Sequence, residues 1–164
     1  MNAIEESARN LVNPASGIAN DYLNSFNEIL LLLENLTVLL PEMVEELLNW
    51  RPVSYVDYFS RSNLPGSAEA LLQYHALPSE FRAHFTCETE NLAKLALAAI
   101  DVLRREYSRK GELDPAGVGD FCTEASRTFR ISLQRVTELV NNGSCGVGEQ
   151  AQAMANRLMM AEPA

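Results

Sequence analysis

Apolar residues recur at steps of three and four along most of this chain, and no stretch alternates apolar with polar residues. Such steps return to one side of an α-helix, whereas alternation is the pattern of a half-buried β-strand. One stripe comprises Ile18, Tyr22, Phe26, Ile29 and Leu33. The sequence therefore predicts an all-α fold. At 164 residues the chain is long enough to bury a core as one domain, residues 1–164.

Three long helices are expected, at about 14–39, 79–110 and 115–141. For the first, Asn13 followed by Pro14 has the composition of a helix cap and first helical residue. Short accessory helices are expected after Pro41 and at about 67–76, and the intervening segment RPVSYVDYFSRSNLPGS has the least regular pattern. The tail EQAQAMANRLMM fits one more amphipathic helix.

The second and third long helices are expected to form an antiparallel hairpin. Basic residues at the end of the second helix suit the negative end of its dipole, and Gly111 is a natural stop. Asp114 can cap the third helix, with Pro115 in its first turn. Because only a few residues separate the two helices, they should lie side by side, giving a helical bundle.

Charge and cysteine content limit the partners and the compartment. The net charge of −9 argues against binding to nucleic acid or to anionic membranes, which both depend on clustered Lys and Arg. The three cysteines are an odd number without CxxC spacing, which favours a reducing compartment. The N-terminus has no pattern of a signal peptide, and the richest apolar run is too short to span a bilayer. We expect an acidic cytoplasmic protein without a cofactor.

Three asparagines share one side of the first long helix, opposite the Tyr22 and Phe26 stripe. Steps of four and three connect Asn20, Asn24, Asn27, Leu31, Glu34 and Val38, which is the spacing of a coiled-coil seam. Asparagine is a poor helix former, and exposed helix faces more often carry Lys, Glu, Arg or Gln. These residues therefore indicate either a second packing surface, for a partner or another copy, or a solvent-exposed face that is rich in asparagine.

Aromatic residues concentrate in the segment from Trp50 to Phe59. Trp50, Arg51, Tyr55 and Tyr58 are candidates for ligand binding, because aromatic rings beside an arginine can stack on a planar ligand or anchor a protein. The alternative is that the rings plug the open end of the bundle.

His84 and Glu88 lie four residues apart and share a helix face, with Cys87 adjacent. Such residues occur in metal sites within bundles, but the Glu-x-x-His pairs of ferritin-like di-iron proteins are missing, so no metal site is predicted. The simpler interpretation is a buried or half-buried Glu88 with its charge satisfied. No set of nucleophile, base and orienting residue stands out.

The sequence thus favours a non-enzymatic protein-interaction module. We expect it to bind another protein, including a second copy of itself as a homodimer, through the Asn20, Asn24, Asn27 and Leu31 face. The competing hypothesis is a bundle that binds a small molecule or metal, including an enzyme, through the Trp50–Phe59 segment with His84 and Glu88.

Overall fold

The structure is a computed structural model that describes residues 11–143, and this part of the chain is helical. In chain order its elements are the 3-10 turn η1 (Asn20–Leu23) and the α-helices α2 (Asn24–Leu39), α3 (Val44–Asn49), α4 (Tyr55–Arg61), α5 (Ser67–His75), α6 (Ser79–Lys110) and α7 (Pro115–Asn142). No strand forms within residues 11–143, where Val12 and Ala19 make an isolated bridge. The prediction of an all-α helical bundle is confirmed.

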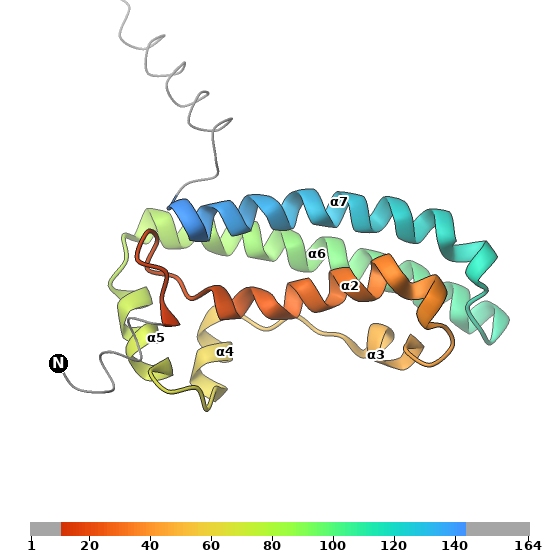
Figure 1. The fold of residues 1–164 in the computed structure, drawn as a ribbon, viewed down its shortest axis with the longest axis horizontal. Coiled ribbons are helices and arrows are strands. Elements are labelled where there is room, and N and C mark those ends of the chain that lie inside the picture. Colours follow the sequence, from red (N-terminus) through yellow and green to blue (C-terminus); the bar gives the residue numbers. More distant parts are fainter. Residues whose placement is uncertain (1–10, 144–164) are drawn as a thin grey trace, which may run out of the picture.

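The long helices α2, α6 and α7 run side by side, while the shorter α3, α4 and α5 lie along one edge of them (Figure 1). Helices α2 and α7 are antiparallel. Gly119, near the start of α7, lies beside Thr37, close to the end of α2. A Cβ atom added to this glycine would lie 3.6 Å from Cγ2 of Thr37. At the other end, Asn20 in η1 reaches Asn141 in the last turn of α7.

The predicted hairpin of the second and third long helices is confirmed. Helix α6 ends at Gly111, whose φ of 76° places it in the left-handed region and whose N–H donates to the Tyr107 carbonyl at 2.7 Å. The N–H of Ala116 donates to Oδ1 of Asp114 at 3.3 Å, and Pro115 begins α7. Both ends were predictable because each rests on a local capping preference.

The predicted start of the first helix at residue 14 is wrong, because residues 13–18 form a turn. Oδ1 of Asn13 accepts from the Ala15 N–H at 3.0 Å, and the Asn13 N–H donates to the Ile18 carbonyl at 2.9 Å. Gly17 has a φ of 77°, a conformation that a helix does not contain. Asn13 therefore stabilises a turn in place of a helix start. Helical geometry begins at η1 and continues through α2.

Helix α4 falls in the segment that was expected to be irregular, so that expectation is wrong. Ser54 caps this helix, since its Oγ accepts from the Asp57 N–H at 3.1 Å. A serine followed three residues later by an acidic residue is a helix-start signal that the sequence did contain. The two other short helices that were expected in this region are α3 and α5. The predicted C-terminal amphipathic helix lies outside the described residues.

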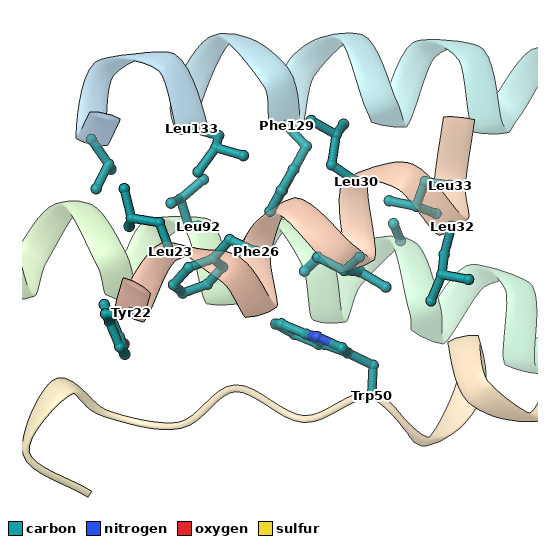
Figure 2. Close-up of a cluster of buried hydrophobic side chains, with 14 of the residues drawn as sticks. Tyr22, Leu23, Phe26, Leu30, Leu32, Leu33, Trp50, Leu92, Phe129 and Leu133 are labelled. Carbon is teal, nitrogen blue, oxygen red and sulfur yellow. The ribbon is translucent and has the colours of Figure 1, made fainter. Parts of the chain in front are cut away.

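The core lies between α2, α6 and α7 and extends under the short helices. All five residues of the predicted stripe from Ile18 to Leu33 are buried. Figure 2 shows Phe26 of α2 facing Leu92 of α6 and Phe129 of α7, with Trp50 below it. The ring centroids of Phe26 lie 6.1 Å from Trp50 and 6.4 Å from Phe129. Phe26 thus connects the long helices to the segment that precedes α4.

Candidate functional site

The side of α2 opposite its buried stripe is exposed to solvent. Leu31 is 58% exposed and Val38 is 82% exposed, whereas Leu33 on the buried side is 1% exposed. Because Leu31 and Val38 are seven residues apart, they lie on one side of the helix, about 10.5 Å apart along its axis. Asn24 and Asn27 are exposed on the same side. We call the surface formed by Asn24, Asn27, Leu31, Glu34 and Val38 the outer face of α2.

Asn20 does not belong to this outer face, although the sequence placed it there. It lies in η1, and its Nδ2 donates to Oδ1 of Asn141 at 2.8 Å. Its own Oδ1 accepts from Nδ2 of Asn13 at 3.2 Å, and Asn13 also donates to Oδ1 of Asn141 at 3.2 Å. The three amides connect the N-terminal turn to the last turn of α7. Asn20 therefore makes intramolecular contacts that the sequence pattern did not indicate.

The other two asparagines remain near the outer surface. Nδ2 of Asn24 donates to Oδ1 of Asp21 at 3.1 Å, within the first turns of the helix. Asn27 lines a shallow groove between α2 and α7, about 290 Å³ in volume, together with Arg130 and Gln134. Beside this groove, Nε of Arg130 donates to Oε1 of Glu34 at 2.8 Å. The outer face of α2 thus continues across a polar groove onto α7.

Trp50 and Tyr55, two of the predicted ligand-binding residues, are part of the core. Trp50 is buried and its Nε1 donates to the Ser25 carbonyl at 3.2 Å. Tyr55 is also buried, and its hydroxyl oxygen accepts from the Ala19 N–H at 3.0 Å. The ring centroid of Tyr55 lies 4.4 Å from that of Tyr74. The polar atoms of both side chains are therefore used within the fold.

Arg51 and Tyr58 also have partners within the chain. Nη1 of Arg51 donates to the carbonyl oxygens of Leu48 and Trp50, at 3.2 and 2.7 Å. The Tyr58 hydroxyl donates to Oδ2 of Asp21. Burial, followed by the hydrogen bond and the charge of Asp21, raises the pKa of Tyr58 to about 12. The hydroxyl is therefore neutral at physiological pH and is not suited to act as a base.

Glu88 connects His84 to α7. Its Oε1 lies 3.6 Å from Nε2 of His84 and 3.5 Å from Nη2 of Arg135, and its side chain is largely buried. This arrangement agrees with the interpretation of Glu88 as a half-buried carboxylate whose charge is satisfied. Within residues 11–143, no group of three or more His, Cys, Asp or Glu side chains is arranged to hold a metal ion. Of the cysteines in this range, Cys87 is exposed and Cys122 is buried.

A hollow that the sequence did not predict lies between the extended residues that follow Trp50 and helix α6. It is lined by Tyr22 and Phe26, by residues 52–54, and by Thr86, Thr89, Glu90 and Ala93 of α6. Neither Trp50 nor Tyr55 lines it. Its parts come from three distant segments of the chain, so no local motif reveals it.

Among the helices of the described range, none combines the length and the apolar character needed to cross a membrane. Comparison of the chain with protein-family models, with curated proteins and with solved structures finds no significant match.

Proposed function

We propose that this chain is a non-enzymatic cytoplasmic protein-interaction module that pairs with a second copy of itself through the outer face of α2. The observation that carries the proposal is the exposure of Leu31 and Val38, at 58% and 82%, two turns apart on one helix side. Burying large apolar side chains against a partner is favourable by about 25 cal/mol for each Å² removed from water. The exposed thiol of Cys87 fits the reducing compartment that the cysteine pattern favours.

A second copy is a suitable partner because the residues around Leu31 can pair with the same residues of that copy. Asn24, Asn27 and Asn35 each carry an amide, which has both donors and an acceptor. An interface between two identical copies presents the same surface patch on both sides, so a self-complementary group is satisfied without a different partner. None of the sixteen residues of α2 is basic, and Glu34 already pairs with Arg130 of α7. Besides the exposed Glu28 and Thr37, the amides and the apolar side chains are the groups of α2 that remain for pairing.

The surface offered by α2 is small, so we expect weak association that depends on concentration. A stable protein interface buries roughly 1,200–2,000 Å² in total, and one exposed helix side with two large apolar residues falls at the low end of this scale. The groove beside Asn27, with Arg130 and Gln134, extends the contact area onto α7.

Sedimentation equilibrium over micromolar to millimolar concentrations tests this proposal. We expect a monomer–dimer equilibrium that Leu31→Arg or Val38→Arg shifts strongly toward monomer. Ile131→Arg is the matched control, because Ile131 of α7 is 57% exposed but does not itself line the groove beside Asn27. A monomer at every concentration, or an equal effect of Ile131→Arg, would refute pairing through this face.

The competing function, binding of a small molecule or metal through the Trp50–Phe59 segment with His84 and Glu88, has less support. The polar atoms of Trp50 and Tyr55 are bonded inside the core, and Glu88 is paired with His84 and Arg135. These contacts favour a structural role for the residues, which is why the interaction module is proposed first.

A further inference from the structure

Residues 50–54 cross the bundle as an extended segment that two aromatic side chains hold in place (Figure 2). The Tyr22 hydroxyl donates to the Val53 carbonyl at 2.6 Å, and Nε1 of Trp50 donates to the Ser25 carbonyl at 3.2 Å. Between this segment and α6 lies a hollow of about 220 Å³, which we call the 50–54 pocket. Hydrogen bonds at both ends of the segment fix its position, so the wall that it forms for the pocket is held in place by the fold.

Most polar side chains around the 50–54 pocket are already bonded inside the protein. The Tyr22 hydroxyl donates to Val53, and Oγ1 of Thr89 donates to the carbonyls of Phe85 and Thr86 at 3.1 and 3.0 Å. Oγ of Ser54 accepts from the Asp57 N–H at 3.1 Å. These groups stabilise the walls of the pocket and are not the groups that attract a charged ligand.

Glu90 is the exception, because it is the one charged residue among those that line the 50–54 pocket. Its side chain has no hydrogen bond or ion pair with any other residue of the described range, 11–143. Lys94 lies one helical turn further along α6 and makes no ion pair with Glu90 in that range. The pocket thus combines apolar walls, in which Pro52, Val53 and Ala93 are the more accessible side chains and Tyr22 and Phe26 lie deeper, with one free carboxylate.

We propose that the 50–54 pocket binds a small organic ammonium ion whose apolar body packs against Pro52, Val53 and Ala93 while its charged group meets Glu90. A carboxylate attracts an ammonium group. Glu90 and the net charge of −9 disfavour anions. The volume is below the roughly 300–1,000 Å³ of pockets for drug-sized ligands, so the ligand is one ring or a short alkyl chain in size.

Titration of the full-length protein with benzylammonium, followed by NMR amide shifts and by calorimetry, tests this inference. We expect saturable shifts at Val53, Thr86 and Ala93, and weaker binding of benzyl alcohol, which has the same ring without the charge. Glu90→Gln should weaken benzylammonium binding about three- to fivefold, the contribution of one solvent-accessible ion pair.

Two variants separate the pocket from general effects of charge and folding. Glu80→Gln removes one exposed carboxylate from the same helix outside the pocket and should leave binding unchanged. Ala93→Leu adds bulk to the pocket wall and should abolish binding, while a thermal unfolding curve checks that this variant is folded. Shifts that do not saturate or lie elsewhere, or equal binding by the Glu90→Gln and original proteins, would overturn the inference. The outcome is independent of whether the chain dimerises through α2.

Discussion

The hydroxyl of Tyr22 donates a 2.6 Å hydrogen bond to the carbonyl oxygen of Val53, and the Tyr22 ring is buried. One side chain therefore joins the start of the helical core to the extended segment before α4. Removal of this hydroxyl leaves the phenyl ring in place and isolates the contribution of the hydrogen bond.

We predict that Tyr22→Phe lowers the free energy of unfolding by about 1 kcal/mol, the usual net contribution of one hydrogen bond within a protein. Urea denaturation at neutral pH measures this change. Tyr107→Phe is a suitable control, because the Tyr107 side chain is partly buried on α6 and its hydroxyl has no hydrogen bond within the described residues. Equal stability of the Tyr22→Phe and original proteins would contradict the prediction.

A second prediction concerns alkaline pH. Burial raises the pKa of Tyr55 to about 12, and burial with the hydrogen bond and charge of Asp21 raises the pKa of Tyr58 to about 12, from an ordinary value of 10. Burial also raises the pKa of the Cys122 thiol to about 11, from an ordinary value of 9. All three groups keep their protons in the folded chain at pH values where the unfolded chain loses them.

The free energy of unfolding should therefore be constant between neutral pH and about pH 9 and fall between about pH 9 and 12. Burial raises the pKa of Tyr22 still further, so the fall should continue above that range. Urea denaturation at a series of pH values measures the profile, and tyrosinate absorbance shows when the hydroxyls ionise. In Tyr58→Phe the fall between about pH 10 and 12 should be smaller. Stability that stays constant from about pH 9 to 12 would contradict these raised pKa values.

The third prediction compares two leucines on α2. Leu33 is 1% exposed and Leu31 is 58% exposed. Leu33→Ala should lower the free energy of unfolding by about 2–5 kcal/mol, because it leaves a cavity in the core. Leu31→Ala should change it by less than about 0.5 kcal/mol, as is usual for a surface substitution.

Both leucine variants are measured by urea denaturation at low protein concentration, where the proposed dimer is dissociated. A large loss of monomer stability in Leu31→Ala would mean that this residue contributes to the monomer fold, and the outer face of α2 would have to be redefined.

The parts of the fold that were predictable from sequence depend on neighbouring residues. The hairpin of α6 and α7 followed from apolar stripes and from the caps at Gly111 and Asp114, which act within one turn of the helix. The start of the first helix was not predictable from Asn13 and Pro14 alone. The same two residues suit a turn, and the positive φ of Gly17 decides between the two structures.

The candidate site was predictable only in part, because its contacts are non-local. The spacing of Asn24, Asn27 and Leu31 correctly indicated exposure on one side of α2. Asn20 departs from this pattern because a 3-10 turn has three residues per turn, and its partner Asn141 is 121 positions away. Whether the outer face binds a second copy stays a prediction.

The three linked amides of Asn13, Asn20 and Asn141 bring positions that are far apart in sequence into one cluster at a single end of the bundle. The described polypeptide therefore closes nearly into a ring. A circularly permuted form, joined between positions 11 and 143 by a short linker and opened in the connection between α4 and α5, would keep every long helix intact. Such a rearrangement would offer attachment points away from the outer face of α2.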